Sequence, residues 1–402
     1  MNRWLKHWPA FHEWGGRTRP QPREWDRPGR EALTAADPAV LLPAPDEVED
    51  PVLRVILERA QAGSRPRARA DKHLVCLAVE GGGMRGAVSA GMCVVLEAVG
   101  LVGAIDLIFG VSAGALNGCA TAMGRAAFGA TLYQDAASHG VIDPVRPLRG
   151  GPVIDFDLLF EELIAARKPW SLDRLASGPE FRALATSLET QSLRVLAGFT
   201  DIDELMQAVR ASASLPRLGG EPPVFRGERM TDGGLREPIP FETAIADGAT
   251  HVLVLRSRPG GYRMPQLSGL CDSFALRADA ELIELVRGHH RVYNRQAAEL
   301  EHRPAASCSG AHVFQVSVPD GTRVIRRLEP SSQRLVDALR LGAKAMASAI
   351  MTEPIDLCWQ PVVYRATPLT AEPASPNVCS EGRPRRGPQA RTIDPVRDGQ
   401  PA

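Results

Sequence analysis

Residues 74–86 read LVCLAVEGGGMRG, a short apolar run that passes directly into a glycine-rich turn. A continuous apolar run of this length is typical of a strand buried on both faces of a parallel sheet. Within the turn, Gly81, Gly83 and Gly86 satisfy the G-x-G-x-x-G spacing of a loop that wraps a dinucleotide pyrophosphate. The same turn could instead direct backbone N–H groups at the oxygen of a carbonyl under nucleophilic attack. These two interpretations predict unrelated enzymes.

Around this turn the chain alternates between apolar strands and amphipathic helices. Helical spacing follows the first two strands, at 87–100 and 112–124, and recurs around 202–213, 278–301 and 331–350. The expected strands are 74–79, 105–109, 193–200, 251–257 and 312–318. Strand and helix in alternation predict a mostly parallel sheet with helices on its faces. Residues 73–350 are therefore expected to form one α/β domain.

The flanks of this domain have a different composition. Residues 1–72 are rich in proline and arginine and contain one short stretch with helical periodicity, PVLRVILERAQAG at 51–63. They predict an N-terminal extension with one short helix. Residues 351–402 are proline-rich and aperiodic, which predicts a disordered C-terminal tail.

Charge and cysteine usage restrict the class of protein. The 47 basic and 47 acidic residues balance, so no overall field favours a nucleic-acid partner. Seven cysteines without a C-x-x-C pair predict reduced core residues, with no disulfide and no metal site. The start of the chain lacks the apolar core of a signal peptide, and no apolar run could cross a bilayer. We expect a cytoplasmic protein, in which Trp4, Trp8 and Trp14 could contact a membrane surface.

The end of the second strand tests the dinucleotide interpretation. A dinucleotide fold needs an acidic residue there, about 20 residues beyond the glycines, to bind the ribose hydroxyls. This chain has Phe109, Gly110, Val111 and Ser112 at those positions. No lysine followed by serine or threonine closes the glycine run, which excludes a Walker phosphate loop. We therefore expect no nucleotide and no cofactor.

The same segment carries a candidate nucleophile. Gly110-Val111-Ser112-Ala113-Gly114 has the G-x-S-x-G pattern on a strand-to-helix turn, which is typical of a nucleophile elbow. Such a turn holds the serine in a strained conformation with its Oγ exposed at the carboxyl end of the sheet. Gly110 and Gly114 are expected because a Cβ there would collide with the neighbouring strand and helix.

A serine hydroxyl needs a base, and the residues leave two choices open. In an ordinary hydrolase an acid and then a histidine follow the serine. Each later histidine fits a surface or partly packed position better than a catalytic one, namely His139, His251, His289, His290, His302 and His312. The alternative is Asp232 in ERMTDGGLREPIP, where Gly233 and Gly234 allow a tight turn beside the carboxylate.

Taken together, EGGGMRG, GVSAG and DGG, with the ASASLP segment at 211–216, resemble the patatin-like phospholipase family. The resemblance covers roughly residues 73–350. It implies a variant of the α/β hydrolase fold, a three-layer α/β/α sandwich with a mostly parallel central sheet. It also implies a Ser-Asp dyad without a catalytic histidine, and lipid carboxylic esters as substrates.

Carried over by position, the resemblance makes Ser112 the nucleophile and Asp232 its base. The loop Gly81-Gly82-Gly83 with Arg85 becomes the oxyanion hole, and Arg85 could also brace the loop or meet a lipid phosphate. Two alternatives remain at this point. One is a Ser-His-Asp carboxylesterase on the same elbow, and the other is a catalytically idle module that binds lipid or protein.

Overall fold

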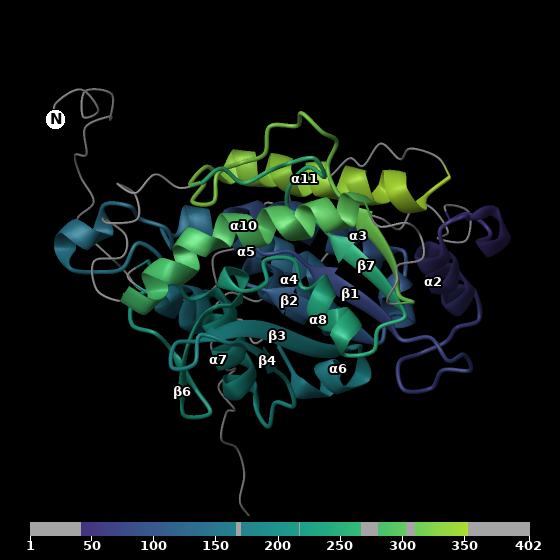
Figure 1. Cartoon of the computed structure of the whole chain (residues 1–402), viewed down its shortest axis with the longest axis horizontal. Helices are drawn as coiled ribbons and strands as arrows, with labels where there is room; N and C mark the ends of the chain where they lie inside the picture. The colour runs from purple at the N-terminus through teal and green to yellow at the C-terminus, as the bar shows by residue number, and fades with distance from the viewer. Residues whose placement is uncertain (1–41, 166–169, 217, 267–279, 303–309, 353–402) are drawn as a thin grey trace, which may run out of the picture. The chain divides into compact units, whose positions relative to one another are not determined.

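Figure 1 shows the computed structural model of the chain, which describes residues 42–165, 170–216, 218–266, 280–302 and 310–352. All of them belong to one compact unit that spans residues 1–362. The three N-terminal tryptophans and all but the first two residues of the predicted C-terminal tail lie outside the described residues.

The centre of this unit is an eight-stranded sheet in the order β5-β6-β3-β2-β1-β7-β8, with β4 paired to β3. The five strands β3, β2, β1, β7 and β8 run parallel, whereas β4 and β6 are antiparallel to β3, and β5 is antiparallel to β6. The mostly parallel sheet is thus confirmed. The strands are β1 (Val75–Val79), β2 (Leu107–Val111), β3 (Glu180–Ser187), β4 (Leu193–Leu196), β5 (Val224–Phe225), β6 (Glu228–Asp232), β7 (His251–Leu255) and β8 (His312–Val316).

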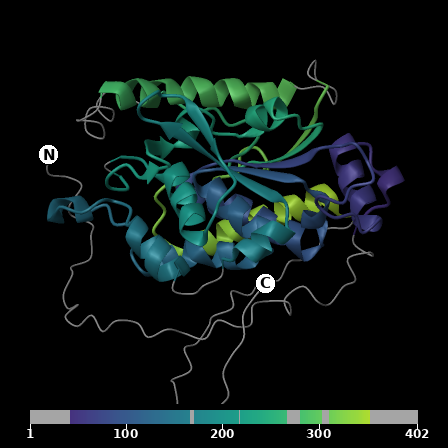
Figure 2. The same cartoon turned by 90° about the horizontal axis from the view of Figure 1, so that it is seen from below.

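Helices cover both faces of the sheet. They are α2 (Pro51–Gln61), α3 (Gly86–Ala98), α4 (Ala113–Ala122), α5 (Ala126–Ser138), α6 (Leu172–Ser177), α7 (Ile202–Ala213), α8 (Phe241–Ala246), α10 (Ala280–His302) and α11 (Ser332–Ile350). Figure 2 shows the sheet between α10 on one side and the blue and yellow helices, among them α3, α5 and α11, on the other.

The side chains of β1 divide the core in two, because successive residues of a strand point to opposite faces. Val75, Leu77 and Val79 lie in the larger hydrophobic cluster, together with residues of α3, α4, α5, α7 and α11. Cys76 and Ala78 lie in the second cluster, with residues of α8 and α10. The predicted three-layer α/β/α sandwich is therefore confirmed.

Helices α3 and α11 pack with their backbones in contact. A methyl group on Gly91 of α3 would collide with the carbonyl oxygen of Leu339, and one on Gly342 of α11 would collide with that of Val88. Glycine is therefore required on both helices at this crossing. The contact matters for the site because α3 begins directly after the glycine-rich turn.

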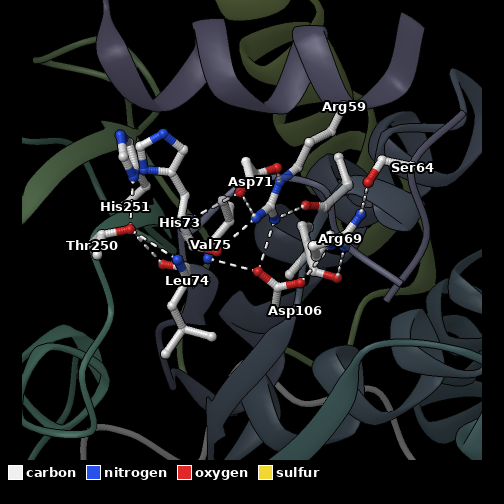
Figure 3. A network of polar contacts seen from close by, with 12 residues as sticks. Arg59, Ser64, Arg69, Asp71, His73, Leu74, Val75, Asp106, Thr250 and His251 are labelled. Atoms are coloured by element: carbon white, nitrogen blue, oxygen red, sulfur yellow. Dashed lines mark hydrogen bonds and ion pairs between the residues drawn. The ribbon is translucent and has the colours of Figure 1, made fainter. Parts of the chain in front are cut away.

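The segment before β1 is joined to the sheet by ion pairs (Figure 3). Arg59 of α2, only 2% exposed, donates to Asp106 at 2.8 Å and to Asp71 at 2.7 Å. Arg69 donates to the other carboxylate oxygen of Asp106 at 2.7 Å, and the N–H of Val75 donates to Asp106 at 2.9 Å. The helix predicted within 51–63 is α2, and its buried arginine connects it to the start of β1 and β2.

The strands differ from the sequence prediction in their boundaries and in number. The strand predicted at 105–109 begins two residues later, at Leu107, and runs on to Val111. Strand β3 was not predicted. The strands expected at 193–200, 251–257 and 312–318 start as predicted but end at 196, 255 and 316.

Candidate active site

Ser112 occupies the sharp turn between β2 and α4. Its backbone has φ 55° and ψ −128°, a conformation that costs a residue with a side chain on the order of 1–3 kcal/mol. A Cβ on Gly110 would lie 2.5 Å from the carbonyl oxygen of Gly114, and one on Gly114 would collide with the carbonyl oxygen of Val79. The helix can therefore start this close to the strands only with glycine at both positions, as the G-x-S-x-G pattern predicts.

Asp232 ends β6 and lies near Ser112 because of the sheet register. Val111 pairs with Leu184 of β3, and Asp232 pairs with Ala185, the next residue. The two chain segments therefore leave the sheet at the same level, on either side of β3. The Asp232 carboxylate accepts a hydrogen bond from the N–H of Gly234 at 2.7 Å, and the Ser112 hydroxyl lies close enough to lower its pKa. The predicted pair is thus brought together.

Both side chains are 9% exposed, and burial dominates the electrostatics of the carboxylate. Burial raises the pKa of Asp232 above that of an ordinary aspartate, against the opposing effects of Gly234, Ser112 and the nearby Arg327 cation. A raised pKa makes this carboxylate a stronger base than an aspartate in water.

Two serines of the ASASLP segment fix the pair, a role that the sequence reasoning did not assign. Ser212, at the end of α7, accepts a hydrogen bond from the Ser112 N–H at 2.9 Å and donates to the carbonyl of Leu184 at 2.6 Å. The carbonyl of Ser214 accepts from the N–H of Asp232 at 2.8 Å. One short segment therefore orients both members of the pair. In the sequence, only the position of this segment ahead of the DGG motif pointed to a role in the site.

The glycine-rich turn faces Ser112. The N–H of Gly81 donates to the carbonyl of Pro238 at 3.3 Å, and its carbonyl accepts from the Ser257 hydroxyl at 2.9 Å. Within the described part of the chain, no acceptor is recorded for the N–H groups of Gly82 and Gly83. Two of the three predicted donors are therefore available to an incoming oxygen, while Gly81 anchors the loop.

A buried ion pair supports this turn from behind. Glu80 is 1% exposed and Arg256 is fully buried, and they meet at 3.1 Å. The same Glu80 oxygen accepts from the N–H of Ser257 at 2.7 Å. Arg256 also donates to the Tyr293 hydroxyl at 2.9 Å, which ties the turn to α10. The loop is thus held in place before any substrate arrives.

A largely apolar cavity opens in front of Ser112, Asp232 and the glycine turn. It encloses about 1290 Å³ of empty space, its open mouth included. The aliphatic and aromatic part of its wall comes from α4, α5, the 141–160 segment, α7 and the residues that follow α7, and includes Leu116, Leu132, Ile142, Ile154, Phe156, Phe160, Val209, Leu215 and Leu218. Such a wall suits a hydrocarbon chain.

Arg85 also lines this cavity. It is 9% exposed, and its Nε is buried without a hydrogen-bond acceptor among the described residues. Burial, together with the neighbouring Arg258 and Arg327 cations, lowers the pKa of Arg85 to about 9. The residue faces the cavity, so its guanidinium is available to a ligand there.

Among the six later histidines, only His289 of α10 lines the cavity. His251 and His312 begin β7 and β8, at the opposite end of the strands from Ser112. Burial, together with the nearby Arg327 and Arg258 cations, lowers the pKa of His289 to about 3, so the ring is neutral, and the ring lies near the backbone of Gly234. Its Nδ1 has no partner among the described residues. In the part of the chain that the structure describes, no carboxylate is hydrogen-bonded to this ring, as a triad would require.

The described residues contain no group of three or more histidine, cysteine, aspartate or glutamate side chains arranged to hold a metal ion. They also contain no helix whose length and apolar character would let it cross a membrane.

Residues 77–245 match the family model of the patatin-like phospholipases, a range that contains the glycine turn, the elbow and Asp232. The resemblance seen in the motifs is thus confirmed. The uncharacterized protein YjjU of Escherichia coli K12 is 26% identical over 254 residues, which cover 61% of this chain and 68% of that protein.

Two solved structures are also similar. VipD from Legionella pneumophila has a TM-score of 0.37 and 14% identity over 72% of this chain and 70% of that one. A human GIVD cytosolic phospholipase A2 in complex with methyl gamma-linolenyl fluorophosphonate has a TM-score of 0.34 and 12% identity, over 75% of this chain and 61% of that one.

Proposed function

We propose that this chain, whose residues 77–245 match the patatin-like phospholipases, is a lipid acyl hydrolase that uses Ser112 as nucleophile and Asp232 as base. One observation carries the proposal. A strained serine lies beside a buried carboxylate and near two N–H groups for which the described residues supply no acceptor, at the wall of an apolar cavity. This arrangement meets the geometric requirements for acyl transfer through a covalent intermediate.

In the first half of the reaction, the Asp232 carboxylate takes the proton of the Ser112 hydroxyl as Oγ attacks the ester carbonyl. The N–H groups of Gly82 and Gly83 bind the oxyanion of the tetrahedral intermediate. Removal of one such donor typically lowers the rate by about 10² to 10³. Asp232 then gives its proton to the departing alcohol, which leaves an acyl group on Ser112.

In the second half, Asp232 takes a proton from a water molecule, which attacks the acyl-serine. The tetrahedral intermediate collapses with return of the proton to Ser112, and the free carboxylic acid is released. During both halves the hydrocarbon chain lies along the apolar wall of the cavity. If an alcohol replaces water in this step, the same residues transfer the acyl group to it.

The rival with a specific observation in its favour is a triad that contains His289, because this histidine lines the cavity. His289 lies near the backbone of Gly234, however, whereas the Ser112 hydroxyl lies beside the Asp232 carboxylate and lowers its pKa. We therefore assign the base to Asp232 and regard His289 as part of the cavity wall.

The experiment compares Ser112→Ala, Asp232→Asn, His289→Asn and the neighbouring control His290→Asn on one short-chain nitrophenyl ester. Members of a catalytic unit fail together, so the first two variants should each lose at least about 10³ in kcat/KM. His289→Asn should stay within about tenfold of wild type, and His290→Asn should match wild type. Circular dichroism checks that each variant is folded.

Labelling by a fluorophosphonate probe separates the enzyme from an idle binding module. The probe should modify wild type at Ser112 and leave Ser112→Ala unmodified, because only an activated serine reacts. Absence of labelling in the folded wild-type protein would favour the idle module. An active Asp232→Asn beside a folded but inactive His289→Asn would replace the dyad with a triad.

A further inference from the structure

A buried amide side chain on α10 binds a backbone segment beside the active site. Gln296 and Ile239 are both fully buried. The N–H of Ile239 donates to Gln296 Oε1 at 3.1 Å, and Gln296 Nε2 donates to the carbonyl of Ile239 at 3.1 Å. A carboxamide suits this pair of backbone groups because it offers both an acceptor and donors. The two hydrogen bonds therefore hold Ile239 at one place against α10.

The sequence around Ile239 makes this contact necessary. Ile239 lies between Pro238 and Pro240, and proline has no N–H, so Ile239 carries the one backbone donor of these three residues. A buried N–H without an acceptor is costly. Gln296 supplies the acceptor, so the path of this proline-bounded segment depends on α10.

The same segment joins two parts of the proposed active site. It follows Asp232, the proposed base, and the carbonyl of Pro238 accepts from the N–H of Gly81 at 3.3 Å. That distance is longer than the usual range of about 2.7–3.2 Å, so the bond is weak. A weak bond can place the glycine turn only if its acceptor is itself fixed. Gln296 fixes the acceptor, because it binds the residue directly after Pro238.

The far end of the glycine turn has an anchor of its own. The N–H of Met84 donates at 2.9 Å to the carbonyl of Arg327, in the loop between β8 and α11. Gly83 permits this docking, because its φ is +58° and a Cβ there would lie 2.7 Å from the same carbonyl oxygen. The turn thus seats the loop that carries Arg327. The N–H groups of Gly82 and Gly83 lie between the anchored residues Gly81 and Met84, so a shift of either anchor moves them.

Helix α10 reaches the start of the turn through a second contact. Tyr293 precedes Gln296 by three residues, so both side chains lie on the same face of the helix. The Tyr293 hydroxyl accepts from Arg256 at 2.9 Å, and Arg256 pairs with Glu80. Glu80 directly precedes Gly81. Two neighbouring side chains of one helix therefore act on the start of the turn.

We propose that Gln296 is a positioning residue for the proposed oxyanion hole. Through Ile239 and Pro238 it sets where the glycine turn lies, and therefore how far the N–H donors of the turn stand from Ser112. Such donors must lie about 2.7–3.1 Å from the oxyanion, so small displacements weaken them. The inference rests on the proposed hydrolase function. Among the described residues that line the cavity, Pro238 is included and Gln296 is not, so Gln296 acts through the turn.

The first test replaces Gln296 with methionine or glutamate, which are close to it in size. Gln296→Met removes both hydrogen bonds, and its kcat on a short-chain nitrophenyl ester should fall roughly 10- to 100-fold, because displaced donors lose part of their effect. KM should stay within about threefold, since the apolar wall is unchanged. Gln296→Glu keeps the acceptor and regains a donor only when its carboxyl is protonated. Its kcat relative to wild type should therefore rise as the pH falls.

Asn294 provides the matched control, because it is an amide on the same helix with the same pattern of contacts. It accepts from the N–H of Met264 at 2.7 Å and donates to the carbonyl of Met264 at 3.0 Å. Met264 lines the cavity, so Asn294→Leu can change KM, but kcat should stay within about threefold of wild type. An equal loss of kcat in Asn294→Leu would assign the effect to the attachment of α10 as a whole and overturn the role of Gln296.

Inhibitor binding separates the oxyanion hole from the rest of the cavity. When Ser112 Oγ adds to the carbonyl carbon of octyl trifluoromethyl ketone, its proton passes to Asp232 and the carbonyl oxygen becomes an oxyanion. The matching secondary alcohol fills the same cavity without forming this adduct. Gln296→Met should weaken inhibition by the ketone roughly 10- to 100-fold and inhibition by the alcohol less than about threefold.

Equal inhibition of wild type and folded Gln296→Met by the ketone would overturn the positioning role while the hydrolase stands. If Gln296→Met does not fold, Gln296→Glu decides, and a kcat ratio to wild type that does not change with pH would overturn the role. A folded wild-type protein that neither hydrolyses the ester nor binds the ketone more tightly than the alcohol would instead overturn the hydrolase function, and this inference with it.

Discussion

Replacement of Ser212 by alanine tests how the elbow is held in its strained shape. The Ser212 hydroxyl accepts from the Ser112 N–H at 2.9 Å and donates to the Leu184 carbonyl at 2.6 Å, and Ser212 is fully buried. Alanine leaves both backbone groups without this partner in a buried site. The change touches neither Ser112 Oγ nor Asp232.

The expected loss of folding free energy is about 2–4 kcal/mol, since each unsatisfied buried group costs about 1–3 kcal/mol. The stabilisation lost with the Ser212 hydroxyl is as large as the strain of about 1–3 kcal/mol at Ser112. Without the hydrogen bond, the Ser112 backbone can therefore leave its strained conformation. A displacement of the nucleophile by about 1 Å can cost 10²-fold. We therefore expect kcat/KM to fall roughly 10- to 100-fold in a protein that still folds.

The assay combines urea unfolding with kcat/KM and with the rate of fluorophosphonate labelling. Thr121→Val is the matched control, because it removes a buried hydroxyl on α4 that donates to the Asn117 carbonyl at 2.7 Å, well along the helix from Ser112. It should lower stability by about 1 kcal/mol without changing the labelling rate. If Ser212→Ala loses stability but labels as fast as Thr121→Val, the hydrogen bond does not restrain the nucleophile.

Two further predictions concern charge. Asp106→Asn should lower the free energy of unfolding by about 3 kcal/mol in urea, because it leaves the buried Arg59 short of a partner. Asp71 is 30% exposed, so Asp71→Asn should lower it by only about 1 kcal/mol. A larger loss in Asp71→Asn than in Asp106→Asn would contradict this account. A base must be deprotonated, so kcat/KM for an uncharged ester should fall with acidification around a midpoint above about 4, the ordinary aspartate range, since burial raises the pKa of Asp232. Arg327→Gln removes a charge that lowers this pKa and should move the midpoint to higher pH, so an unmoved midpoint would place Arg327 too far from the base.

The parts of the fold that depend on local pattern could be predicted from the sequence. Local patterns were enough to predict three features: the strand β1 from its apolar run, the helices α7 and α11 from their periodicity, and the turn at the G-x-S-x-G motif. The resemblance of three motifs then paired Ser112 with Asp232, which no local pattern could do. The structure places the two side chains close together, while their catalytic roles remain a proposal for the variants to test.

Strand β3 shows why the rest could not be predicted. Its sequence EFRALATS contains glutamate, arginine, alanine and leucine, which all favour helix in isolation. It is a strand because it fills the gap between β2 and β6, where Arg182 lies 5.6 Å from the ring centre of Phe109 and pairs with Asp247. Such contacts join residues far apart in the chain, and the same holds for the contact between Gln296 and Ile239.

The crossing of α3 and α11 limits how this sequence can change. A Cβ on Gly91 or on Gly342 would collide with backbone atoms of the other helix. A smaller side chain on the other helix therefore cannot make room for it, because no side chain stands in the way. Helix α11 follows the loop that carries Arg327, and α3 follows the turn that seats it. In relatives that retain an arginine at the position of Arg327, both glycines should therefore be invariant. Relatives that have lost either glycine should also have lost the arginine-bearing loop, which an alignment of such sequences can check.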